Sequence, residues 1–136
     1  MDDIDQRLLA FLESDSRMSY TDLGKKLGLS DVAVRKRIDR LVENGTITNF
    51  SLNIDHSKVG KPLHAFILLR CKPSDAGEVL EGVKKIDAVR RIFQMLGPYD
   101  LMLEIHCAGT SELKAVADER IGSLHGVNEI RTMIIV

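Results

Sequence analysis

The sequence predicts an α+β protein in which an N-terminal helix-turn-helix domain, of winged-helix-like form, precedes a C-terminal ferredoxin-like βαββαβ domain. Three observations predict this class. Apolar residues recur at helical spacing as far as residue 42, the pattern then changes to the alternation of a strand, and the second half repeats a strand-helix-strand unit twice. We expect the boundaries to fall at 1–47 for the helix-turn-helix domain, 48–62 for a strand and linker, and 63–136 for the ferredoxin-like domain.

Capping residues mark the first two helices. Asp2 and Asp3 favour a helix start, and apolar residues recur at helical spacing after them. This pattern predicts a first helix that ends near Ser14. Ser19 then opens a Ser-x-x-Asp capping box, and two leucines lie four residues apart on one face of a short second helix. This helix stops at Gly28, the residue type best able to adopt a left-handed C-terminal conformation.

A third helix begins only two residues later, with Ser30 as its N-cap. An Asn-Gly pair at residues 44–45 closes it. Its apolar stripe is Val34, Ile38, Leu41 and Val42. Two helices joined by so short a turn have the spacing of a helix-turn-helix.

The charge distribution indicates what this motif binds. The whole chain has a formal net charge of −1, but residues 17–40 contain seven basic residues against three acidic ones, a local charge of +4. A protein that is neutral overall can still present one basic helix to phosphates. We therefore expect double-stranded DNA as a partner. The alternative is that these charges form the solvated face of an ordinary surface helix; the tight turn and the capped helix before it favour DNA binding.

The predicted third helix supplies most of the candidate DNA contacts. Arg35 is placed for bidentate contact with guanine, while Lys36 and Arg40 are expected to meet phosphates. Arg37 lies at the edge of the apolar stripe and has two interpretations, a DNA contact or an ion pair with an acid of its own domain. The predicted DNA-binding set is Ser19, Tyr20, Ser30, Asp31, Val32, Arg35, Lys36, Arg37 and Arg40.

The rest of the chain is expected to be mainly strands and two helices. Residues 46–54 alternate with period two, which predicts a strand, and turn residues fill 55–62. Strands are then predicted at 63–71, 88–96, 101–107 and 127–136. One helix starts at Pro73-Ser74, and Thr110 or Ser111 caps another. The last strand stays apolar to its end, so we expect another subunit to cover it.

No residue pattern indicates an enzyme, a metal site or a cofactor. No nucleophile-base-acid set or Gly-rich phosphate loop is visible, and an acylphosphatase-like enzyme would need a phosphate loop that the first strand of this domain does not offer. The four histidines show no metal-ligand spacing. Cys71 and Cys107 are far apart and are expected to be small buried residues. An acidic N-terminus and the lack of a long apolar run favour a cytoplasmic protein with no membrane partner.

Together these segments resemble the Lrp/AsnC family, also called the feast/famine regulators of bacteria and archaea. The resemblance covers nearly the whole chain and is specific because the pieces occur in this order and spacing. It rests on Asp2 and Asp5, Leu8-Leu9, Ser16-Arg17-Met18-Ser19, Leu23-Gly24, Leu27-Gly28-Leu29-Ser30, Val34-Arg35-Lys36-Arg37-Ile38-Asp39-Arg40-Leu41, Gly45-Thr46-Ile47, Asp55, Gly60, Ala65-Phe66 and Gly97-Pro98-Tyr99-Asp100.

The resemblance implies a transcription regulator whose C-terminal domain forms dimers through its sheet, assembles further into tetramers or octamers, and binds an amino-acid effector between subunits. It also leaves open a less specific, architectural role in wrapping DNA. The effector residues that it implies are Gly97, Tyr99 and Asp100 and, less directly, Thr110, Ser111 and Glu112. The alternative for residues 97–100 is a purely structural turn.

Overall fold

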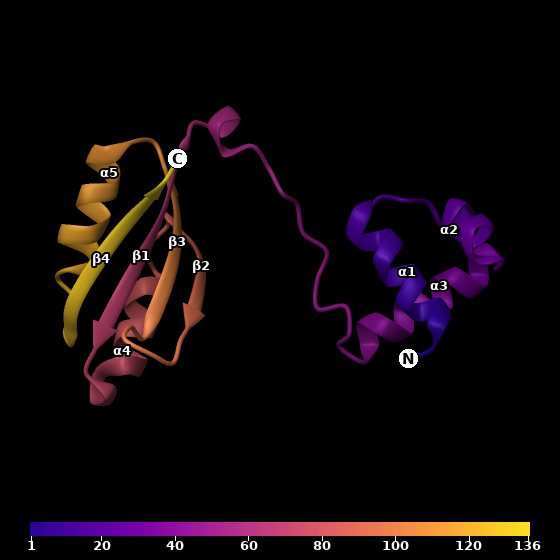
Figure 1. The fold of residues 1–136 in the computed structure, drawn as a ribbon, viewed down its shortest axis with the longest axis horizontal. Coiled ribbons are helices and arrows are strands. Elements are labelled where there is room, and N and C mark those ends of the chain that lie inside the picture. Colours follow the sequence, from indigo (N-terminus) through magenta and orange to yellow (C-terminus); the bar gives the residue numbers. More distant parts are fainter. The chain divides into compact units, whose positions relative to one another are not determined.

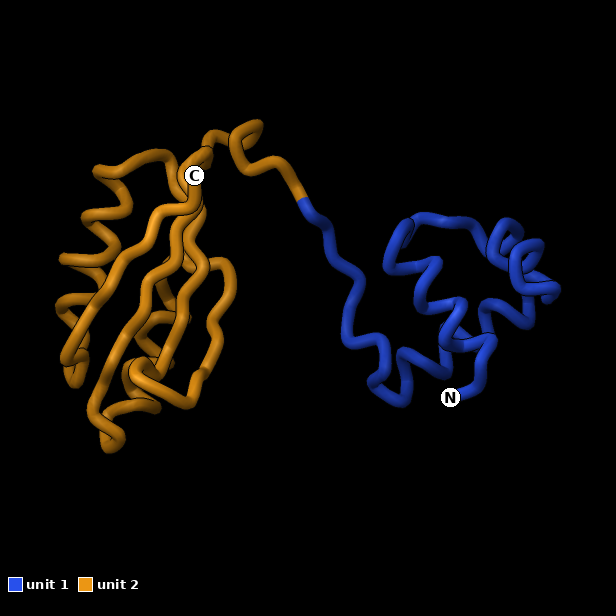
Figure 2. Tube along the Cα trace, viewed as in Figure 1, with its two compact units in different colours: residues 1–53 blue, residues 54–136 orange.

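The computed structural model describes all 136 residues, and they divide into two compact units, residues 1–53 and residues 54–136 (Figures 1 and 2). Each unit has a hydrophobic core of its own. None of the helices combines the length and the apolar composition that crossing a bilayer requires.

The N-terminal unit consists of three helices, α1 (Asp3–Ser14), α2 (Tyr20–Leu27) and α3 (Asp31–Glu43). Each begins where the sequence places a cap. The side chains of Asp2, Ser19 and Ser30 accept hydrogen bonds from backbone N–H groups three residues further along, at Asp5, Asp22 and Ala33. The predicted helix starts in this unit are therefore confirmed.

The turn between α2 and α3 depends on two glycines. Gly28 ends α2 with a φ of 71°, a left-handed conformation that favours glycine. Gly24 permits close packing, because a Cβ atom added there would lie 2.4 Å from the carbonyl oxygen of Leu29. The apolar stripes then pack together into one core of Leu8, Leu12, Leu23, Leu27, Val34, Ile38 and Leu41.

The strand predicted over residues 46–54 is wrong for the single chain. This stretch forms no helix or strand. Near its start, the N–H of Ile47 donates a hydrogen bond of 2.9 Å to the carbonyl oxygen of Leu41. A strand requires a neighbouring strand to pair its N–H and C=O groups, and the chain provides none here. As a result Phe50, Leu52 and Ile54 remain exposed although they alternate as predicted.

The C-terminal unit is a four-stranded antiparallel sheet with the strand order β2-β3-β1-β4. The predicted βαββαβ order is confirmed, with short helices added before β1 and α4. In chain order the elements are η1 (His56–Val59), β1 (Leu63–Cys71), η2 (Pro73–Asp75), α4 (Ala76–Lys84), β2 (Val89–Gln94), β3 (Leu101–Cys107), α5 (Thr110–Ala115), η3 (Val116–Ile121) and β4 (Val127–Ile135).

The start of α5 differs from the prediction. Gly109 is its N-cap residue, and neither Thr110 nor Ser111 provides a side-chain cap. Instead the carboxylate of Glu112 accepts a hydrogen bond of 2.8 Å from the N–H of Ala108, so a side chain from within the first turn reaches back to the preceding loop. The helix then continues as the π-helical stretch η3.

The two faces of the sheet have different environments. Odd-numbered residues of β1 and β3 face a core that also contains residues of α4, α5 and η3, and some of them, such as Ile67 and Leu103, are fully buried there. Even-numbered residues of the same strands point to the other face, because successive side chains of a strand alternate. This face is called helix-free because α4, α5 and η3 all pack on the opposite one. The two free cysteines, Cys71 and Cys107, are buried as predicted, and burial raises the pKa of both thiols.

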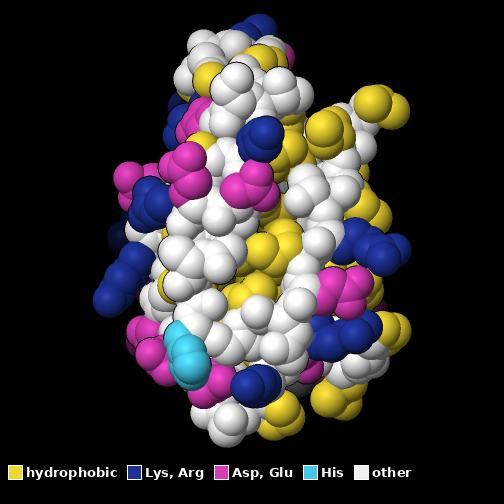
Figure 3. All heavy atoms as spheres, turned by 90° about the vertical axis from the view of Figure 1, so that its left-hand side faces the viewer, with side chains coloured by type: hydrophobic (Ala, Val, Ile, Leu, Met, Phe, Trp, Pro, Cys, Tyr) yellow, Lys and Arg dark blue, Asp and Glu magenta, His cyan; other side chains and the backbone are white.

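The surface that faces the viewer in Figure 3 mixes both signs of charge. Acidic and basic side chains are interspersed around apolar side chains in the middle of the view, and neither sign dominates.

β4 forms one edge of the sheet, with no strand beyond it. Its last residues, Met133, Ile134 and Ile135, are exposed.

Candidate nucleic-acid interface and effector site

Helix α3 has one face that is buried in the core and an opposite, exposed face, which we call its free face. Val34, Ile38 and Leu41 are buried in the N-terminal core. On the other side Val32, Arg35 and Lys36 are exposed, as the sequence predicts. A short helix fixed by three buried side chains and displaying basic ones is the arrangement that helix-turn-helix proteins present to the major groove.

Arg35 is positioned by a neighbouring aromatic ring. Its guanidinium carbon lies 5.3 Å from the centre of the Tyr20 ring, so the first residue of α2 supports a side chain of α3 through a cation–π contact. The ion pairs of α3 are made by Arg37 and Arg40. Arg35 and Lys36 form no ion pair within the chain.

Three of the predicted DNA-binding side chains already have partners inside the unit. The hydroxyls of Ser19 and Ser30 are helix caps, and the carboxylate of Asp31 accepts a hydrogen bond of 2.9 Å from the hydroxyl of Thr21. This last bond links the starts of α2 and α3. These three side chains stabilise the motif, and all three residues are exposed, as Val32 and Arg35 are.

Arg37 forms ion pairs with acids of its own unit, one of the two interpretations that the sequence left open. One of its guanidinium nitrogens lies 2.7 Å from Asp2 and 2.9 Å from Asp5, whose side chain is only 5% exposed. Hydrogen bonding from Arg37 lowers the pKa of Asp2, and the two acids raise the pKa of Arg37. Arg40 also reaches Asp5, at 3.4 Å, but 59% of its side chain stays exposed.

The turn at residues 97–100 is tied to the sheet by several hydrogen bonds. The carboxylate of Asp100 accepts a bond of 2.9 Å from the N–H of Cys71, and the hydroxyl of Tyr99 donates one of 3.0 Å to Glu129. Arg70 donates to the carbonyl oxygen of Pro98 at 2.9 Å. A cavity of about 210 Å³ lies next to the turn, with Cys71 and Asp100 in its lining.

The structure does not bring the two groups of predicted effector residues together. Gly97, Tyr99 and Asp100 precede β3, whereas Thr110, Ser111 and Glu112 follow it. The seven residues of β3 separate the two groups by roughly 20 Å, at about 3.3 Å per residue. Within one chain they cannot contact the same small molecule.

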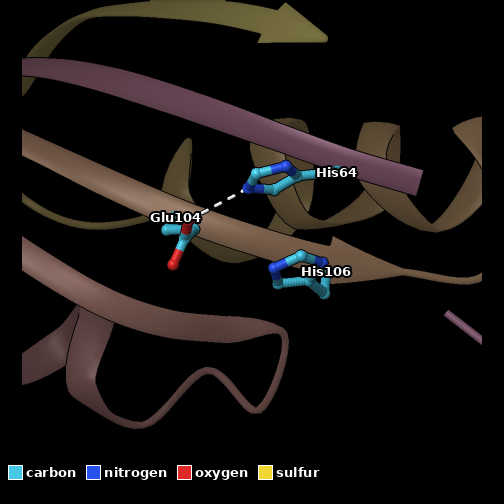
Figure 4. Close-up of side chains that lie close together, drawn as sticks. All are labelled: His64, Glu104 and His106. Atoms are coloured by element: carbon cyan, nitrogen blue, oxygen red, sulfur yellow. Dashed lines mark hydrogen bonds and ion pairs between the residues drawn. The ribbon is translucent and has the colours of Figure 1, made fainter. Parts of the chain in front are cut away.

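A histidine cluster on the helix-free face escaped the sequence analysis. His64 and His106 are cross-strand partners in β1 and β3, and their rings stack with centres 4.2 Å apart. His56 of η1 stacks on the other side of His106 at 3.6 Å. The Nε2 atom of His64 lies 3.0 Å from the carboxylate of Glu104 (Figure 4). The spacing of the histidines along the sequence does not reveal this cluster. The alternation of side chains along each strand, combined with the pairing of β1 with β3, could have revealed it.

Glu104 joins this cluster to an arginine of the neighbouring strand. Arg91 of β2 donates hydrogen bonds to both oxygens of Glu104, at 2.7 and 3.3 Å. These bonds, together with the one to His64, lower the pKa of Glu104 to about 2 despite its burial. Burial and the adjacent His56 and His64 lower the pKa of His106.

Comparison with known proteins matches both units to described domain families. Residues 1–42 match the AsnC-type helix-turn-helix domain, and residues 64–136 match the Lrp/AsnC ligand binding domain. An uncharacterised HTH-type transcriptional regulator of Pyrococcus horikoshii is 33% identical over 98% of this chain and 91% of its own length. The HTH-type transcriptional regulator LrpA of the same organism is 31% identical over 99% of this chain and 96% of its own.

A solved structure has the same fold over the whole chain. The transcriptional regulator NMB0573 of Neisseria meningitidis, determined as a complex with L-Met, superposes with a TM-score of 0.93 and covers 100% of this chain and 90% of its own. Its sequence is 20% identical, so this likeness concerns the fold.

Proposed function

The chain belongs to the Lrp/AsnC family of transcriptional regulators, and we propose that it binds its operator as a homo-oligomer and responds to an amino acid held by its C-terminal units. It is a regulator with a helix-turn-helix DNA-binding domain and a ligand-binding domain. The proposal concerns which residues contact DNA, how the chains assemble and where the amino acid binds.

The free face of α3 is the observation that carries the DNA-binding part. Arg35 is exposed, is supported by the ring of Tyr20 and has no acid to neutralise it, which suits a bidentate contact with a guanine base. Lys36 and the exposed part of Arg40 would meet phosphates beside it. Arg37 instead fixes α3 to the start of α1 through Asp2 and Asp5, so its contribution to DNA binding is positional.

Two copies of α3 are needed to read a two-part operator. Recognition helices of dimers enter successive major grooves about 34 Å apart. The C-terminal sheet offers surfaces for assembly, since its helix-free face and the edge strand β4 both expose apolar side chains such as Phe93 and Met133. We expect dimers through these sheets, and tetramers or octamers built from them.

If the amino acid binds between two subunits, both groups of predicted effector residues can contact it, although they lie far apart within one chain. Asp100 offers a carboxylate to an α-amino group, and Thr110, Ser111 and Glu112 open α5 at the far end of β3. The turn of one protomer and the start of α5 of another can meet only across an interface. The L-Met complex of NMB0573 supports an amino acid as the ligand class.

Fluorescence anisotropy with the DNA upstream of the protein's own gene tests this proposal, with and without a mixture of the twenty amino acids. Arg35→Ala should weaken binding to that DNA by about 1–3 kcal/mol while weak binding to unrelated DNA persists. Lys85→Ala is the matched control, because Lys85 is an exposed base of the C-terminal unit. Equal losses on specific and unrelated DNA would instead indicate an architectural DNA binder, and no response to the mixture would contradict the sensor part.

A further inference from the structure

We propose that His64, Glu104 and His106 form a binding site for one divalent first-row transition-metal ion, with Zn²⁺ as the best match. This site lies in the C-terminal unit, is separate from the turn at residues 97–100, and does not depend on the proposed function. It is built from side chains of one chain alone.

The sheet itself brings the three side chains together. His64 of β1 and His106 of β3 are paired across the two strands, and Glu104 precedes His106 by two residues on the same face of β3. Figure 4 shows the carboxylate turned toward the His64 ring, with the His106 ring alongside. One donor atom from each residue lies within 4.8 Å of the others.

The donor set determines the class of ion. Two imidazole nitrogens and one carboxylate oxygen form a ligand set that Zn²⁺ uses with a fourth, open position, and other first-row divalent ions accept the same donors. Ligands about 2.0–2.2 Å from a tetrahedral ion lie roughly 3.4 Å from one another. The cluster must therefore contract, and the two stacked rings, now 6° from parallel, must tilt so that both nitrogens point at the ion. His64, whose side chain is 31% exposed, has room to rotate.

An unpartnered nitrogen atom is the second observation. The Nδ1 atom of His106 is buried and has no hydrogen-bond partner in the protein, although buried polar atoms of native proteins nearly always have one. His56 and His64 stack on either side of this ring. These two rings hold His106 in place on the face where His64 and Glu104 also lie. An unprotonated nitrogen of this ring can serve as a ligand to a metal ion.

Arg91 is placed to orient the carboxylate of Glu104 without binding the ion itself. It donates its shorter bond, 2.7 Å, to Oε1 of Glu104 and a longer one, 3.3 Å, to Oε2, the oxygen that His64 also contacts. An ion could replace His64 as the partner of Oε2 while Arg91 keeps its bond to Oε1. Metal-bound carboxylates are commonly oriented by such a second hydrogen bond.

Titration of the untagged, full-length chain with Co²⁺, followed by visible absorption, and with Zn²⁺, followed by calorimetry, tests the proposal. We expect one ion per chain. His106→Gln and His64→Gln should each lower the affinity by more than about 100-fold, because losing a ligand should exceed the 10–100-fold cost of losing an outer partner. His125→Gln is the control, since His125 is an exposed histidine of the same unit, outside the cluster.

In the titrations, three outcomes would overturn the proposal: no binding to the wild-type chain, equal weakening in His125→Gln, or unchanged binding in both cluster variants. Far-ultraviolet circular dichroism of each variant establishes that it is folded. If a histidine variant unfolds, NMR of the histidine rings in the wild-type chain still tests the metal site. Zn²⁺ should then shift the ring signals of His64 and His106 and leave those of His125 unchanged, and a shift confined to His125 would contradict the site.

Discussion

The two units of this regulator assemble their candidate sites in different ways. In the N-terminal unit the main candidates lie along the single helix α3, where Val34 and Ile38 bury one face and Arg35 and Lys36 occupy the other. In the C-terminal unit the candidate effector residues lie at opposite ends of β3, and the histidine cluster joins strands whose members are about forty positions apart in sequence. A local site needs one well-placed helix, whereas a distributed site needs the whole sheet and, for the effector, a second chain.

The acidic residues of the two units serve different purposes as well. Asp2 and Asp5 hold Arg37 and so fix α3 against the start of α1, leaving Arg35 uncompensated for DNA. Glu104 instead collects Arg91 and His64 from the two strands on either side of β3. Acids thus position the interface in one unit and form the centre of a cluster in the other.

The comparison predicts that the units lose stability separately. Leu8 is fully buried in the N-terminal core, so Leu8→Ala should cost that unit about 2–5 kcal/mol and abolish DNA binding, because α3 packs on the same core. Leu103→Ala is the matched change in the C-terminal core and should spare the helical unit. Calorimetry on both variants measures the two transitions; if they shift together in either variant, the units do not unfold independently.

The sequence was most informative where structure depends on neighbouring residues. The caps Asp2, Ser19 and Ser30 and the left-handed Gly28 are local signals, and the structure confirms all four. The βαββαβ order was also predictable, because each strand shows its own alternation or apolar run.

What the sequence predicted wrongly or left undecided required knowledge of partners. Residues 46–54 have the alternation of a strand, but a strand forms only against another strand, and the single chain has none beside them. Whether Arg37 faced DNA or Asp5 depended on where α1 packs, which helix periodicity does not determine. The pairing of His64 with His106 follows from strand register, which sequence spacing alone does not reveal.

Asp100 allows the effector part of the comparison to be sharpened. Asp100→Ala removes the acceptor of the Cys71 N–H and should cost the C-terminal unit about 1 kcal/mol, whereas Asp100→Asn keeps an acceptor oxygen and should preserve stability. If the carboxylate also receives an amino group, both variants should lose the amino-acid response in the anisotropy assay. A response retained by Asp100→Asn would make residues 97–100 a structural turn, and loss of ligand-free DNA binding in that variant would show that the turn serves assembly.

The smallest expected effect concerns the acids that hold α3. Because its bond from Arg37 lowers the pKa of Asp2 below its ordinary value of 3.8, ionised Asp2 contributes stability that is fully present above about pH 4 and is lost as the pH falls through the lowered pKa. Asp2→Asn keeps a good N-cap but removes the charge. The variant should therefore melt below the wild type at pH 7, and this difference should shrink as the pH falls below 3.8.

Asp3→Asn is the control for this last change, because it removes a charge from the next residue, the first of α1, without touching the pair with Arg37. It should lower the melting temperature of the N-terminal transition less than Asp2→Asn does at pH 7. Both differences arise at one helix end and should leave the C-terminal transition unchanged. Equal effects of the two variants would mean that the helix dipole alone accounts for the acids, and that Arg37 is not held by Asp2 in solution.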